Sequence, residues 1–315
     1  MIRATATMPS RGFRVRATPL VAALAVAGCL GLRFGSIDLA QPGITIAACA
    51  AIGAFGFPHG ALDIELIRGG HQRVAAILAV YLGVAAGMAG LWLVAPLIAL
   101  GAFLTIAVLH FAEDWTTAGS RIAATGIAVA VLATPALLHR GDVAAIFVGL
   151  TGTPVAAAFA TGLAAVAPAA LAVAALGIAR MLARGAFADA AAAAASLVAL
   201  AALPPAAGFA VFFCLFHSPR HFAAARREAN RWQAARWAPV VIPVMLAAAA
   251  IVVVLYVLHP APTVSGRLTA AIFTALSILT APHMLAPALV ERVRRMSAPG
   301  VSPAAGPSSM PRRAA

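Results

Sequence analysis

The sequence predicts an all-α fold, a polytopic helical bundle embedded in a membrane. Of its residues, 63% are hydrophobic and only 10% are charged, whereas soluble domains contain about 25% charged residues. The apolar residues fall in runs of about 20, the length that a helix needs to cross a bilayer. We therefore expect one transmembrane domain at residues 17–290. A basic cytoplasmic segment at 1–16 precedes it, and a basic, disordered cytoplasmic tail at 291–315 follows.

Ten runs have the length and composition of spanning helices. Their expected limits are 17–33, 43–66, 73–95, 96–115, 121–138, 154–179, 186–203, 205–222, 239–258 and 267–290. The segment 143–153 is expected to be re-entrant or interfacial. A true count of eight would leave the sidedness unchanged. The four tryptophans lie near expected span ends, as in an aromatic belt; they are Trp92, Trp115, Trp232 and Trp237.

The distribution of arginine predicts the orientation in the membrane. Cytoplasmic loops carry the excess of basic residues. With ten spans and both termini in the cytoplasm, 19 of the 22 arginines fall on the inner side and only Arg33, Arg140 and Arg267 on the outer side. We expect a multi-pass protein of the cell inner (plasma) membrane.

Composition also excludes several function classes. All 22 basic residues are arginine, so no lysine can form a Schiff base, as a retinal-binding rhodopsin or a pyridoxal enzyme requires. The net charge of +13 is dispersed between apolar segments, which argues against nucleic acid as a partner. Cys29, Cys49 and Cys214 have no paired spacing, so neither disulfides nor a cysteine zinc site is expected.

Five histidines lie within the expected spans, where ionisable residues are rare and functional by default. They are His59, His110, His217, His221 and His283. All five fall on even-numbered helices, each in the half of its helix nearer the cytoplasm. They are therefore expected to share one layer of the membrane, as a transition-metal site requires.

The spacing of His217 and His221, four residues apart, predicts that they share one helix face. Pro219 lies between them and is expected to kink the helix or start a new one. If Ser218 were the N-cap and Pro219 the first helical residue, His217 would stand just before the helix.

Carboxylates accompany the histidines. Asp63 follows His59 by four residues, and Glu113 and Asp114 follow His110 by three and four. Metal-ligating histidines usually donate their second N–H to a carboxylate or carbonyl. Asp63, Glu113 and Asp114 are therefore expected to surround the ligands.

A set of imidazoles without thiolates suits iron, copper or zinc. The zinc-protease sequence His-Glu-x-x-His is absent, and the isolated histidines are too few for two irons, so one iron with open positions for O₂ fits best. Three alternatives stay open: another lipid oxygenase or hydroxylase, a histidine-lined metal or proton transporter, and a haem-binding subunit.

Four motifs resemble the Brp/Blh-type β-carotene 15,15′-dioxygenases in order and spacing, over residues 43–290. They are Phe57-Pro58-His59-Gly60-Ala61-Leu62-Asp63, His110-Phe111-Ala112-Glu113-Asp114, His217-Ser218-Pro219-Arg220-His221 and Ala281-Pro282-His283. The resemblance implies a non-haem Fe(2+) enzyme that cleaves β-carotene with O₂ at its central double bond into two retinal molecules.

The same resemblance implies His59, His110, His217 and His221 as iron ligands, with His283 in a related but unassigned role. Retinal would serve a separate rhodopsin. A long apolar tunnel is expected to place the central bond at the metal, and its candidate liners are Phe55, Phe57, Phe103, Phe111, Phe212, Phe213 and Phe216.

Overall fold

In the computed structural model, which describes residues 18–35, 39, 41–61, 71–228 and 234–297, every regular element is helical. The first half contains α1 (Thr18–Phe34), α2 (Pro42–Ala61), α4 (His71–Val94), α5 (Pro96–Ala112), η1 (Glu113–Ala118), α6 (Arg121–Leu138) and α7 (Arg140–Thr151). The second half contains η2 (Pro154–Ala156), α8 (Ala157–Ala183), α9 (Phe187–Ala202), α10 (Pro205–Phe212), η3 (Phe213–His217), α11 (Ser218–Glu228), α12 (Ala234–Leu258) and α13 (Val264–Ser297).

The helices begin and end where proline and glycine predict. Pro96 and Pro205 open α5 and α10, because the first helical residue needs no backbone N–H partner. Gly119 and Gly152 end η1 and α7 with positive φ angles of 81° and 68°, a conformation that costs glycine little. The prolines explain why the expected starts of these two spans, residues 96 and 205, coincide with the starts of the helices.

Four helices within the described ranges are long and apolar enough to cross a membrane; they are Pro96–Ala118, Arg121–Leu138, Pro154–Ala183 and Val264–Leu285. Shorter apolar helices occupy Thr18–Phe34, Pro42–Phe57, Leu78–Val94, Phe187–Ala202 and Ile242–Leu258. The count of ten spans and the orientation of the termini stay predictions.

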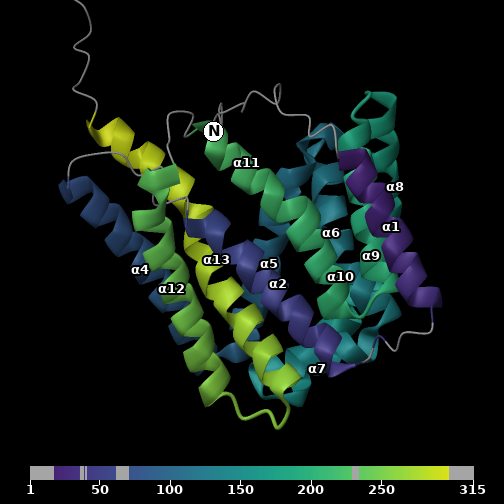
Figure 1. Ribbon diagram of the computed structural model, residues 1–315, viewed down its shortest axis with the longest axis horizontal. Coiled ribbons are helices and arrows are strands. Elements are labelled where there is room, and N and C mark those ends of the chain that lie inside the picture. The colour runs from purple at the N-terminus through teal and green to yellow at the C-terminus, as the bar shows by residue number, and fades with distance from the viewer. Residues whose placement is uncertain (1–17, 36–38, 40, 62–70, 229–233, 298–315) are drawn as a thin grey trace, which may run out of the picture.

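Small residues let these helices approach closely, as is common where lipid removes the hydrophobic drive for association. The tightest pair is α6 and α8, where a Cβ placed on Gly126 would overlap the side chain of Val173. On the opposite side of the bundle, α4 and α12 each pack along α13 (Figure 1). Helices α2, α5 and α10 lie between these two groups.

Most of the segment 143–153 lies in a helix, α7, which ends at Thr151 and packs against α8; its re-entrant or interfacial position stays a prediction. Two expectations need correction. Helix α13 continues to Ser297, so residues 291–297 of the expected disordered tail are helical. Trp92 and Trp115 are buried at 9% and 0% exposure and are not part of an interfacial belt; Trp232 and the side chain of Trp237 lie outside the described residues.

Candidate metal centre

His110 stands in the last turn of α5 and is only 3% exposed. Its Nδ1 atom is buried and has no hydrogen-bond partner among the residues that the structure describes. A buried polar atom without a partner is costly. His110 is therefore placed as a ligand-binding group would be, at a point where an additional atom would restore the lost interaction.

His217 and His221 come from a helix with an irregular turn. Residues Phe213–His217 form a π-helix between α10 and α11, and π turns often occur at functional sites. Ser218 has helical angles (φ −57°, ψ −42°), so it is not an N-cap, and the expectation of a helix start at Pro219 is wrong. This wider turn immediately precedes Pro219, which has no backbone N–H to donate to the helix.

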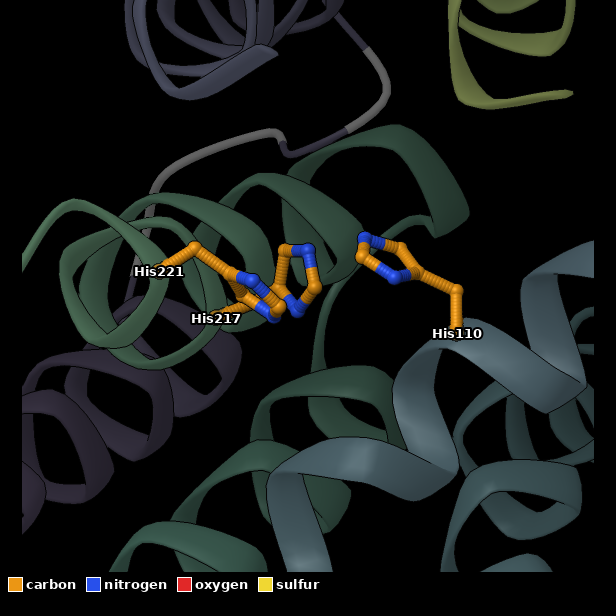
Figure 2. A group of neighbouring side chains, drawn as sticks. All are labelled: His110, His217 and His221. Atoms are coloured by element: carbon orange, nitrogen blue, oxygen red, sulfur yellow. The ribbon is translucent and has the colours of Figure 1, made fainter. Parts of the chain in front are cut away.

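The structure brings four histidines together. The rings of His217 and His221 lie 4.5 Å apart between centroids, and those of His110 and His217 lie 4.7 Å apart. Figure 2 shows the ring of His110 approaching from one helix and the rings of His217 and His221 from another. His283 on α13 completes the group, with its ring centroid 4.9 Å from that of His110. Helices far apart in sequence thus converge on one point.

The buried side chain of Asp114 contacts two of these histidines. Its side chain is 3% exposed, and its Oδ2 lies 2.7 Å from Nδ1 of His217. Because a carboxylate only accepts hydrogen bonds, Nδ1 of His217 carries the hydrogen and Nε2 carries the lone pair. Oδ1 of Asp114 lies 3.2 Å from Nε2 of His221. One carboxylate therefore orients two imidazoles, although its position in the sequence suggested a partnership with His110.

The other expected carboxylates are placed differently. Glu113 is 60% exposed, and its Oε2 lies 3.8 Å from Nδ1 of His110, too far for a hydrogen bond. Asp63 lies outside the described residues. The backbone of His59 is in the last turn of α2, but its side chain is also outside the described part of the chain. The roles expected for His59 and Asp63 stay predictions.

Sequence reasoning treated Arg220 only as one of the cytoplasmic arginines. Its Nη1 donates to the backbone carbonyl of Asp114 at 3.0 Å, and its Nη2 donates to Oδ1 of Asp189 at 3.0 Å. Its guanidinium also lies 4.6 Å from the centre of the Trp115 ring. Arg220 therefore ties η1, which carries Asp114, to α9 and α11. Its place between two histidines of one motif was a signal that could have identified it.

The donor set fits a transition metal. One ligand nitrogen from each of His110, His217 and His221 lies within 4.8 Å of the others. Two nitrogens bound to one metal lie at most about 4.2 Å apart, because metal–imidazole bonds are about 2.1 Å long. The three donors are therefore gathered near one point, and they would draw closer together around a bound metal. Neutral imidazoles suit iron, copper or zinc.

A cavity of about 320 Å³ adjoins the histidines, between α2, α4, α5, α10, α12 and α13. His110 and His283 form part of its wall, and Tyr81 and Thr280 are the other polar side chains that line it within the described residues. Of the expected aromatic liners, Phe57, Phe103, Phe111 and Phe213 line the cavity, together with Phe209, which was not expected. Phe55, Phe212 and Phe216 do not belong to its wall.

Among known proteins, the family model described as Beta-carotene 15,15'-dioxygenase matches residues 50–290. This range includes every described residue that lines the cavity and the four histidines of the cluster. No curated protein and no solved structure matches the chain.

Proposed function

The chain belongs to the β-carotene 15,15′-dioxygenase family, and from that premise we propose that it cleaves β-carotene with O₂ at the central 15,15′ double bond. Each substrate molecule would yield two molecules of all-trans-retinal. Both atoms of O₂ enter the two aldehydes, so the reaction needs no external reductant. The observation that best supports this proposal is an apolar cavity that ends at a buried cluster of imidazoles.

We propose Fe(2+) as the cofactor, held by His110, His217 and His221 together with His59. When bound, iron with open coordination positions supplies the activation of O₂. Asp114 holds His217 in the tautomer whose Nε2 carries the lone pair and keeps His221 turned toward the same point. Asp63, Glu113 and His283 are proposed as surrounding or alternative groups.

The protein must also place the central double bond of the polyene, and not one of its similar neighbours, beside the metal. Apart from the two histidines, Tyr81 and Thr280, the side chains of the cavity wall are apolar, so the cavity would select mainly by shape and apolar contact. Phe111 and Phe213 line the cavity, and their rings lie 4.9 and 5.2 Å from that of His217. These aromatic rings would hold the polyene beside the imidazoles and exclude water.

The setting proposed for this reaction is the inner membrane, in which the chain is a multi-pass protein and the substrate is dissolved. The product would supply a separate rhodopsin, because this chain has no lysine to bind retinal.

The test is to express the chain in bacteria that accumulate β-carotene and to analyse the extracted pigments by chromatography. We expect retinal to appear as β-carotene is lost, and we expect no retinal from His110→Ala or His217→Ala. His259→Ala is the matched control, because His259 bonds instead to the carbonyl of Gly149.

The chromatographic analysis of the pigments also distinguishes cleavage from the alternative reactions. A hydroxylase would return an oxygenated product with an intact carbon skeleton. Unchanged β-carotene in cells that contain the iron-loaded protein would overturn the proposed substrate, and retinal formation by His110→Ala would overturn the proposed ligands.

A further inference from the structure

The cavity beside the histidines reaches the outer surface of the bundle between two helices. At its inner end are His110, Phe111 and Phe213, all buried. At its outer end are Leu82 of α4, which is 58% exposed, and Pro243 and Ala247 of α12, which are also exposed. The wall is therefore continuous from a surface position to the candidate metal centre.

The two helices at this opening are joined mainly through a third. Helices α4 and α12 each pack along α13, and few contacts join them directly within the described residues (Figure 1). We call the outer end of the cavity, at Leu82, Pro243 and Ala247, its mouth. The seam between α4 and α12 is thus closed chiefly by the side chains at this mouth. Widening it would break little packing between α4 and α12 themselves.

The surface around the mouth is apolar. Besides Leu82, the exposed side chains nearby in sequence are Val80 on α4, and Ile242 and Leu246 on α12. Both helices contain apolar segments, Leu78–Val94 and Ile242–Leu258. In a membrane-embedded chain such a surface faces lipid tails, so a polar molecule dissolved in water would not approach the mouth.

We propose that the substrate enters sideways from the bilayer, through the seam between α4 and α12, with Leu82 and Ala247 at the mouth. The ligand class is a long polyene hydrocarbon without polar groups, which has no hydrogen bonds to lose on leaving the lipid. This inference rests on the proposed function for the identity of the polyene. It adds the route by which the substrate enters. It also implies that residues at the mouth, away from the histidines, control the rate of substrate entry.

The test measures entry without turnover. Full-length protein in lipid nanodiscs is kept anaerobic, β-carotene is supplied from donor vesicles, and binding is followed by the circular dichroism induced in the polyene. Ala247→Trp fills the mouth, whereas Ala249→Trp adds the same bulk two residues away, at an exposed position outside the cavity wall. We expect Ala247→Trp to slow binding at least fivefold and Ala249→Trp to leave it unchanged.

Leu82→Trp gives a second variant on the other helix, with Leu93→Trp as its control, since Leu93 is 85% exposed and outside the wall. Wild-type binding rates in both Ala247→Trp and Leu82→Trp would overturn the lateral route. Equal slowing in the variants and their controls would overturn it as well. If wild-type protein binds the polyene through this mouth but forms no retinal in air, the route stands and the proposed reaction fails.

Discussion

The carboxylate of Asp114 accepts a hydrogen bond from His217 over 2.7 Å, in a position that water does not reach. The two residues are 103 positions apart in the sequence. The bond fixes the direction in which His217 presents its second nitrogen, and the same carboxylate lies 3.2 Å from His221. Two of the candidate ligands are therefore oriented by one side chain.

Removal of the negative charge of Asp114 should weaken metal binding. In Asp114→Asn the amide can present an N–H to His217, which would favour the wrong tautomer. We expect the affinity for Fe(2+) to fall roughly 10- to 100-fold, as for other groups that orient metal ligands. Metal titration of the purified protein measures the loss, with exposed Asp142→Asn as the control. Equal affinities for wild type and Asp114→Asn would refute the orienting role.

Arg220 should act on the metal through Asp114. Arg220→Ala removes the donor to the Asp114 carbonyl and to Asp189, and we expect a roughly tenfold loss of metal affinity. Arg220→Lys should restore only part of this metal affinity. The ammonium group of lysine cannot replace the planar guanidinium, which makes both hydrogen bonds and lies over the Trp115 ring. The absorption spectrum of the Co(2+)-loaded protein reports the change in ligand geometry.

Arg267→Ala is a close control for this variant. Arg267 also donates to a backbone carbonyl, that of Ala261, and lies over the Tyr256 ring, but it is near the start of α13. A Co(2+) spectrum altered equally by both variants would mean that Arg220 acts only through overall stability.

His283 should matter for turnover more than for metal retention. Its ring is 4.9 Å from that of His110 but 6.1 Å from that of His221, and it lines the cavity. We expect His283→Ala to keep its iron and lose activity, whereas His110→Ala loses both. Metal analysis beside retinal formation separates these results. His139→Ala, which removes a bond to the Ala201 carbonyl, should remain active. Iron loss in His283→Ala as large as in His110→Ala would make His283 a ligand.

A methyl group at Gly56 should narrow the cavity. A Cβ there would lie 2.9 Å from Cε1 of Phe213 and 3.4 Å from Leu276, so these side chains would have to move into the space for substrate. We expect Gly56→Ala to lower retinal formation severalfold while iron content stays at the wild-type level. Gly101→Ala is the control, since its new Cβ would make only an ordinary contact with Phe159 at 3.5 Å. Full activity in Gly56→Ala would show that this part of the wall does not limit the substrate.

Much of the helical framework could be predicted, because hydropathy, proline and glycine act locally. The limits of α6 agree with the expected span at both ends. The i, i+4 spacing also predicted that His217 and His221 would meet, although Pro219 suggested a break. The π turn that resolves this conflict has no local sequence signal.

The partners of the site residues could not be predicted in the same way. Asp114 follows His110 by four residues, yet it bonds to His217. It lies in η1, a 3-10 helix with three residues per turn, so the i, i+4 alignment of α5 does not continue through it. Such pairings depend on how separate helices pack, and one sequence does not specify that packing directly.

The π turn at Phe213–His217 also has a consequence for how this site tolerates changes in chain length. It contains one residue more than an ordinary helical turn, so the loss of a single residue there would convert it to α-helix without interrupting the helix. Because the extra residue is held within one turn, the helix on either side of it would keep about the same register. The same deletion in α10 or α11 would instead rotate one part of the helix against the other by about 100°, as the 3.6-residue period requires. Chain length is therefore under stricter constraint in the regular helices beside this turn than within the turn itself.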